Sequence, residues 1–465
     1  MTQRLIALAA PLALAACSLA PRTVLPSPPV PPSWPVGDAY LARSEAALPV
    51  VSYRDIFRDP RLQSLVETAL AENRDLRVAA ANLAAARAQA RVARAAQFPE
   101  IGVGGSVDHT DRSGQKSTTN YAVSAGISGF ELDLFGKLAN ASEAERNRAL
   151  ATEAAARTVR LGLVADLVDA WASYAADRDL LAIATETAEN ARKSVRLTRA
   201  RLEGGVAPRT DLRQAEQVLA TAEGNVARQK TALAQDENLI RLLAGADFDK
   251  ALLPGGMAEV VGTVAVLPAG TRSEVLLHRP DIVQAEYLLR AANADIGVAR
   301  AALFPSISLT GLLGFASTAL GNLFDSAAFS KSAGADAALT IFDAGKRGAN
   351  VAVAKADRDA ALASYEGVIQ GAFREVADAL ADQGTIDDRL KAAAAYRAAA
   401  ADTAMLADAR YRGGVDSFLA NLDAQRSLFA ARQAEVGTQL EMVRNRITLY
   451  RVLGGDQASG ESLSP

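Results

Sequence analysis

The sequence is poor in the residues that build catalytic and metal sites. It contains one cysteine and only two histidines, His109 and His278, among 465 residues. A single cysteine excludes an intramolecular disulfide, and two histidines in separate segments make a histidine-based triad or a zinc site implausible. We therefore expect no enzymatic activity, no bound metal and no other cofactor.

Large side chains and net charge are also scarce. Aromatic residues make up 5% of the chain and the formal net charge is −3, although 50% of the residues are hydrophobic. Much of that hydrophobic fraction is alanine, which predicts thin interfaces between helices in place of one thick core. The charge provides no broad basic surface, so nucleic acid is not an expected partner.

No segment has the roughly 20 uncharged apolar residues that a transmembrane helix needs. The apolar run at residues 5–14 follows the basic Arg4 and precedes small residues, which is the layout of a secretory signal peptide. The order Leu14-Ala15-Ala16-Cys17 resembles the lipobox of bacterial lipoproteins, in which the cysteine becomes an acylated N-terminus. We predict a signal peptide over 1–16 and stable anchoring by acyl chains on Cys17. The alternative is a lone core cysteine in a soluble protein.

Beyond the anchor the chain repeats itself. Seven prolines between residues 21 and 35 predict an extended spacer. After it, Val92–Pro99 recurs as Val298–Pro305, 206 residues later, and both Gly136-Lys137 and Gly204–Val206 recur 209 residues later. Three landmarks in the same order indicate a duplication. The predicted divisions are an anchor and spacer over 17–60, a first repeat over 61–245, a linking segment over 246–279, a second repeat over 280–455 and a disordered tail over 456–465.

Each repeat predicts one very long helix. No proline occurs from Gly136 to Glu203, and helix-forming residues dominate there and again from about Lys346 to Arg412. At 1.5 Å per residue each helix would be roughly 100 Å long. A helix of that length does not fit a compact domain, so we expect coiled-coil packing.

Each repeat also contains two segments in which apolar residues alternate with small or polar ones. They predict strands at about 99–109, 118–134, 305–316 and 333–343. Their length and pattern are typical of transmembrane β-strands. Four strands cannot close a barrel, and a membrane tolerates no open sheet edge, so the chain would have to oligomerise; three copies would supply about twelve strands. The alternative is a pair of soluble hairpins packed on a helix.

Several longer motifs carry a family resemblance. They are Asn73–Leu76, Phe130–Lys137, Leu277–Ile282 and Leu422–Gln425. From Asp59 to Gly455 the chain resembles the outer-membrane lipoproteins of resistance-nodulation-division (RND) efflux systems, the TolC-like outer membrane factor family. His278 stands where that family usually has arginine, and we expect only a local effect.

The resemblance implies an α+β membrane protein. In the expected homotrimer, a 12-stranded β-barrel with four strands per protomer lies in outer-membrane lipid. It continues into a long α-helical coiled-coil barrel across the periplasm, with an equatorial belt that includes 246–279. The implied function is a passive exit duct that works with a periplasmic adaptor and an inner-membrane RND pump. The alternatives are a type I secretion channel and a periplasmic coiled-coil tethering lipoprotein without a pore.

The resemblance also implies a gate at the periplasmic end. Leu419 and Asp423, four residues apart on one helix face, match the constriction as an apolar plug and an acidic ring that draws cations. Tyr411 is matched with Asp211 as a link that holds the gate shut, whereas Asp416, matched with Thr210, stands where TolC has a basic residue. The turns of two helix hairpins would receive the adaptor, at Gly204, Gly205, Gly413 and Gly414.

Overall fold

The computed structural model describes residues 18–22, 26–31, 33–35, 37, 39–40, 52–114, 116–266 and 273–455. The predicted signal peptide, Cys17 and the predicted tail lie outside these residues. The chain divides into two compact units, each built from three stretches of sequence. Unit 1 comprises Met1–Ser27, Asn82–Ala154 and Val283–Gly367, and unit 2 comprises Pro28–Ala81, Ala155–Ile282 and Val368–Pro465.

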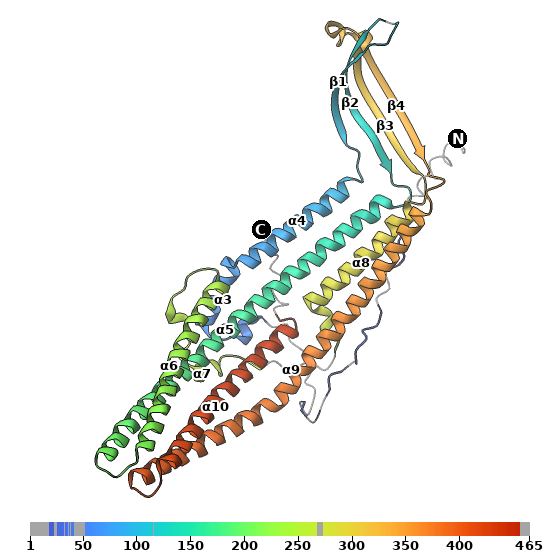
Figure 1. The fold of residues 1–465 in the computed structure, drawn as a ribbon. Coiled ribbons are helices and arrows are strands. Elements are labelled where there is room, and N and C mark those ends of the chain that lie inside the picture. The colour runs from blue at the N-terminus through green and yellow to red at the C-terminus, as the bar shows by residue number, and fades with distance from the viewer. Residues whose placement is uncertain are drawn as a thin grey trace. The chain divides into compact units, whose positions relative to one another are not determined.

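Unit 1 contains one four-stranded antiparallel sheet in the order β1-β2-β3-β4 (Figure 1). The strands are β1 (Ile101–Thr110), β2 (Thr118–Leu132), β3 (Ser306–Ser317) and β4 (Phe329–Ala338). The β2–β3 register shifts between Ile127 and Phe130, where Gly129 has a φ of 66° and donates its N–H to Thr310 Oγ1 at 3.1 Å. This local irregularity is a β-bulge, which increases the twist of the strand. All four predicted strands are present.

The position predicted for the fourth strand, 333–343, was wrong at both ends. β4 begins at Phe329 because it pairs with Phe315 of β3, and the two rings pack edge to face at 5.4 Å. It ends at Ala338 because the following residues form the approach to the next helix, where the Asp343 carboxylate accepts hydrogen bonds from Arg347 and the Gly345 N–H. The connection between β3 and β4 contains the 3-10 helices η3 (Leu320–Asn322) and η4 (Ser326–Ala328).

The helices of unit 1 meet through small side chains. They are most of α8 (Pro280–Ala301) and parts of α4 (Arg74–Ala95), α5 (Lys137–Glu203) and α9 (Lys346–Arg412). The buried residues include Ala144, Ala151, Ala154, Ala291 and Ala294. α5 and α9 have 67 residues each, so both long helices are confirmed, and the alanine-rich interfaces are as expected. None of the helices in the described ranges combines the length and apolarity that crossing a membrane requires.

Unit 2 has a core with larger side chains. Its further helices are α2 (Tyr53–Ile56), α3 (Pro60–Glu72), α6 (Arg209–Ala244), α7 (Met257–Val260) and α10 (Phe418–Val452), together with the 3-10 helices η1 (Lys250–Leu252) and η2 (Ser273–His278). The buried Trp171 indole donates to the Leu252 carbonyl at 3.0 Å, and Phe57 packs edge to face on Tyr450 at 5.0 Å. The Trp171 contact joins the long helix α5 to the segment predicted as a linker, and the Phe57 contact joins the end of α2 to α10.

Part of the proline-rich spacer belongs to this core. Trp34 is only 3% exposed and stacks on Phe373 of α9 at 5.0 Å. A buried indole contributes a large apolar area, which favours packing over free extension. Trp34 therefore fixes this point of the predicted spacer against α9.

Candidate functional site

Two helix hairpins of unit 2, α5–α6 and α9–α10, each end in a turn of the same type (Figure 1). After α5, the Gly205 N–H donates to the Leu202 carbonyl and the Val206 N–H to the Arg201 carbonyl, at 3.0 and 2.9 Å. The turn after α9 repeats this pattern at Gly414 and Val415. These pairs satisfy the last carbonyls of each helix in a Schellman motif.

The two glycines of each turn have different roles. Gly205 and Gly414 have φ angles of 75° and 76°, whereas Gly204 and Gly413 do not have positive φ. Only the second glycine of each pair occupies the left-handed region that other residues avoid. The valine that follows it, Val206 or Val415, is exposed at the tip.

A small apolar cluster lies between the two hairpins near their tips. Tyr411 and Phe418 pack edge to face at 5.4 Å, and both are buried. The other buried members of the cluster are Val195, Leu212, Ala215 and Leu422. Since these side chains come from α5, α6, α9 and α10, the cluster ties the two hairpins to each other near their tips.

The polar contacts of Tyr411 connect α9 to α5. Its hydroxyl lies 3.2 Å from Thr198 Oγ1, and both residues are buried. The Arg201 guanidinium lies over the Tyr411 ring, 4.6 Å from its centroid, and donates to the Arg412 carbonyl at 3.0 Å. We call these four residues, Thr198, Arg201, Tyr411 and Arg412, the tip latch.

In this structure the Tyr411 hydroxyl has a different partner from the Asp211 that the resemblance implied. Within the described residues no hydrogen bond joins these two side chains, and the tyrosine hydroxyl is paired with Thr198 instead. Asp211 is half-buried in the first turn of α6. The reason is geometric, since packing of Tyr411 in the apolar cluster directs its hydroxyl toward α5.

Asp416 forms an ion pair inside its own hairpin. Arg410 binds both of its carboxylate oxygens, at 2.6 and 3.0 Å. Hydrogen bonding to this guanidinium lowers the pKa of Asp416 below its ordinary value. The pair closes the α9–α10 turn and makes no bridge to α5 or α6.

Leu419 and Asp423 occupy the exposed face of α10. Leu419 is 52% exposed, and the nearest cation to the Asp423 carboxylate is Arg426, at 4.0 Å. On the opposite face, Phe418 and Leu422 are buried in the apolar cluster. The part of the chain that the structure describes thus leaves an apolar side chain and a carboxylate uncovered, one helical turn apart.

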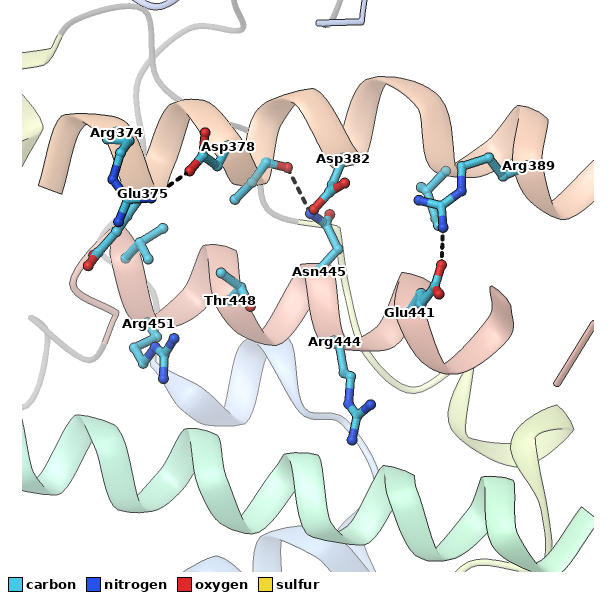
Figure 2. A pocket seen from close by; sticks show the side chains of 13 residues that line it. Arg374, Glu375, Asp378, Asp382, Arg389, Glu441, Arg444, Asn445, Thr448 and Arg451 are labelled. Atoms are coloured by element: carbon cyan, nitrogen blue, oxygen red, sulfur yellow. Dashed lines mark hydrogen bonds and ion pairs between the residues drawn. The ribbon is translucent and has the colours of Figure 1, made fainter. Parts of the chain in front are cut away.

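Two cavities open on these helices. The first, the inter-hairpin cavity, has a volume of about 560 Å³ and lies between the two hairpins beside the tip latch. The second has a volume of about 550 Å³ and lies between α9 and α10 (Figure 2). Its lining includes four arginines and four acidic residues, of which Arg389 and Glu441 pair across the cleft and Arg374 and Asp378 pair along α9.

The charged side chains that line the second cavity balance in number. Asn445 donates to the Ala379 carbonyl at 2.7 Å, so hydrogen bonds as well as ion pairs join the two helices there. Among the described residues, no group of three or more histidine, cysteine or acidic side chains is arranged to hold a metal ion. We therefore assign this cleft to helix packing.

The sequence alone did not point to Thr198 or Arg201 as functional residues. It also gave no sign of the second cavity. Thr198 is one of several threonines on the long helices, and nothing in its sequence neighbourhood distinguishes it. Its role becomes visible only where Tyr411, 213 residues away, packs against it.

Comparisons with known proteins give a consistent result. The family described as outer membrane efflux protein matches residues 65–246 and 271–455. The toluene efflux pump outer membrane protein TtgC of Pseudomonas putida is 39% identical, over 98% of this chain and 96% of its own length. The cation efflux system protein CusC of Escherichia coli O157:H7 is 38% identical, over 96% of each.

A solved structure shows the same fold. The open state of the Neisseria gonorrhoeae MtrE outer membrane channel superimposes with a TM-score of 0.85 at 32% identity. The match covers 95% of this chain and 98% of MtrE. The similarity therefore includes the sheet, the long helices and both hairpins.

Proposed function

The chain belongs to the outer membrane efflux protein family, and from this we propose that three copies of it form the passive exit duct of a tripartite efflux pump. It is an outer-membrane channel protein of an efflux system and extends into the periplasm. In the proposed duct, an inner-membrane RND pump supplies the energy and a periplasmic adaptor connects the two.

The sheet carries the argument for assembly. β1 and β4 are the outer strands of the described sheet, and each pairs with one neighbour only. Every residue of both strands is exposed. An unpaired strand edge is costly in lipid because its N–H and C=O groups find no partner, so edges of neighbouring copies would pair. Three copies would close a wall of about twelve strands.

The hairpin tips are the proposed adaptor site. The turns at Gly204-Gly205 and Gly413-Gly414 each present an exposed valine, Val206 and Val415. Because the two hairpins present similar exposed valines, they suit an adaptor whose own helical tips repeat and can contact both turns in the same way. Relatives are named for toluene and for cations, so we propose that the duct filters little and that the pump selects the substrate.

The gate is proposed on α10. Leu419 and Asp423 from three copies would meet on the symmetry axis, as an apolar plug and a ring of carboxylates that attracts cations. The tip latch would hold each α9–α10 hairpin in the closed position, with Tyr411 as its centre. Asp211, which lacks a hydrogen bond to Tyr411 here, would act only after a rearrangement of the tip.

One combined experiment tests this proposal. Native mass spectrometry of protein extracted from outer membranes should give a trimer, and planar bilayers should show channels whose conductance rises in Asp423→Ala. Asp402→Ala, which removes an exposed carboxylate from α9, is the matched control and should behave as wild type. A monomer without channel activity would favour the alternative of a tethering lipoprotein. Unchanged currents in Asp423→Ala would rule out the proposed acidic ring.

A further inference from the structure

The inter-hairpin cavity has the size of a small-molecule site. Its volume of about 560 Å³ lies within the range of roughly 300–1,000 Å³ that ligand pockets occupy. Its walls come from α5, α6, α9 and α10, so any occupant would contact both hairpins. All lining residues belong to unit 2.

One side of the cavity is apolar and aromatic. Tyr411, Phe418 and Leu422 face it from the buried cluster, and Leu197 and Val218 border it. Tyr411 and Phe418 pack at 60° to each other and are each 4% exposed, so a flat ring in the cavity would contact the small part of each ring that stays uncovered. The apolar part of an occupant should therefore be planar and aromatic.

The charged side chains favour an anion. The lining includes Lys193, Arg201 and Arg412 but only one acid, Asp408, and that acid is paired with Arg412 at 2.9 Å. Arg201 is engaged in the tip latch. Lys193 has neither an ion pair nor a hydrogen bond with the residues that the structure describes, so its ammonium is available to a carboxylate.

A buried amide adds a requirement for a hydrogen-bond donor. Asn421 lines the cavity and is only 3% exposed. Its Oδ1 atom is buried and accepts no hydrogen bond from the described part of the chain. Leaving a buried acceptor unpaired is unfavourable, and a donor group on a ligand would satisfy it once the Asn421 amide turns toward the cavity.

We propose that the inter-hairpin cavity binds small planar aromatic carboxylates that also carry a hydroxyl or N–H donor, and that the bound ligand holds the tip latch closed. The second part rests on the proposed channel function. A ligand that contacts α5 and α10 together binds best to the arrangement in which the two hairpins are in contact. By linkage it stabilises that arrangement over any in which the hairpins separate.

The binding test uses the full-length protein and 6-hydroxy-2-naphthoate as the probe. Equilibrium dialysis with the same detergent in both chambers cancels the uptake of the probe by micelles. We expect saturable binding of one probe per chain. Lys193→Gln should weaken binding about tenfold, the effect of losing one hydrogen bond to a charged group. Lys230→Gln, which changes an exposed lysine of α6 outside the cavity, should leave binding unchanged.

Two analogues separate the charge from the donor. The methyl ester of the probe has no charge, so Lys193→Gln should not alter its binding. 2-Naphthoate has no hydroxyl and should bind the wild type more weakly than the probe does. The Asn421→Leu variant should bind 2-naphthoate and the probe equally well. Uptake that does not saturate, or that is the same in the wild type and in both variants, would overturn the site.

Bilayer recordings test the effect on the latch. The probe should lower the open probability of wild-type channels and have little effect on Lys193→Gln. Saturable binding with unchanged currents would overturn the locking role. Absence of any channel would count against the proposed function, whereas the dialysis result would still decide whether the site exists.

Discussion

At the scale of single residues, the tip latch depends on one buried hydroxyl pair. Thr198 and Tyr411 are both buried, so neither hydroxyl can exchange its partner for bulk water without local opening. Removing one of them leaves the other unpaired, which costs about 1–3 kcal/mol. The cation over the Tyr411 ring adds to the contact, since Arg201 also binds the Arg412 carbonyl.

Thr198→Val should therefore favour an open channel. Valine keeps the branched shape of threonine but removes the hydroxyl, so the closed state should lose about 1 kcal/mol, roughly fivefold in the opening equilibrium. Tyr411→Phe should have a similar effect, and the double variant should add little. Thr185→Val, whose hydroxyl only donates to the Leu181 carbonyl of its own helix, is the control. If Thr198→Val and Tyr411→Phe both keep the wild-type open probability, the tip latch does not hold the channel closed.

At the scale of elements, each hairpin turn depends on one glycine. Gly205→Ala and Gly414→Ala should each destabilise the tip by about 1–2 kcal/mol, because alanine is disfavoured at positive φ. Gly204→Ala and Gly413→Ala should have little effect on the backbone, since these glycines lack positive φ. Hydrogen exchange of the tip amides measures the difference. Equal protection in all four variants would contradict this assignment.

The α5–α6 hairpin also contains a pair of carboxyl groups, Asp177 and Asp236, joined by a hydrogen bond. Burial, followed by the charge of Asp177, raises the pKa of Asp236 to about 7, and burial raises the pKa of Asp177 as well. Asp169 on α5 acts in the same direction on Asp236, whereas Arg444 on α10 opposes the shift. One proton is therefore shared between the two groups in the folded state.

This pair predicts a stability that falls as the pH rises. An unfolded aspartate has an ordinary pKa of 3.8, so the folded state binds the extra proton between about pH 4 and about pH 7. The stabilisation is present at the acid end of this window and is lost toward pH 7. The melting temperature measured by circular dichroism should fall from about pH 5 to about pH 8, and the fall should be smaller in Asp236→Asn than in the wild type. The exposed control Asp402→Asn should show the same pH dependence as the wild type. If Asp236→Asn shows that same pH dependence too, the shared proton is contradicted.

At the scale of the whole molecule, the N-terminal residues and the sheet belong to the same compact unit. Ser18 donates to Asn140 of α5 at 2.9 Å, and the carbonyls of Leu19 and Pro21 accept from Arg300 and Asn293 of α8. The residues directly after Cys17 are thus attached to unit 1. A lipid anchor at Cys17 and a membrane-inserted sheet would then act on one body.

Intact mass measurement tests the anchor. The mature wild-type protein should begin at Cys17 and carry the mass of several acyl chains, whereas Cys17→Ser should lack this mass and retain the signal peptide. Cys17→Ser should also be less abundant in outer membranes, because one of two membrane attachments is lost. A wild-type protein that keeps an unmodified Cys17 would exclude the lipoprotein assignment.

The sequence by itself determined the features that depend on neighbours along the chain. The two 67-residue helices, the four alternating strands and the repeated glycine turns follow from local periodicity and from the placement of proline and glycine. Only the tertiary structure decided which distant groups meet. It paired Tyr411 with Thr198, packed Trp34 on Phe373 and ended β4 at Ala338, because each outcome is set by the surface that another part of the chain presents.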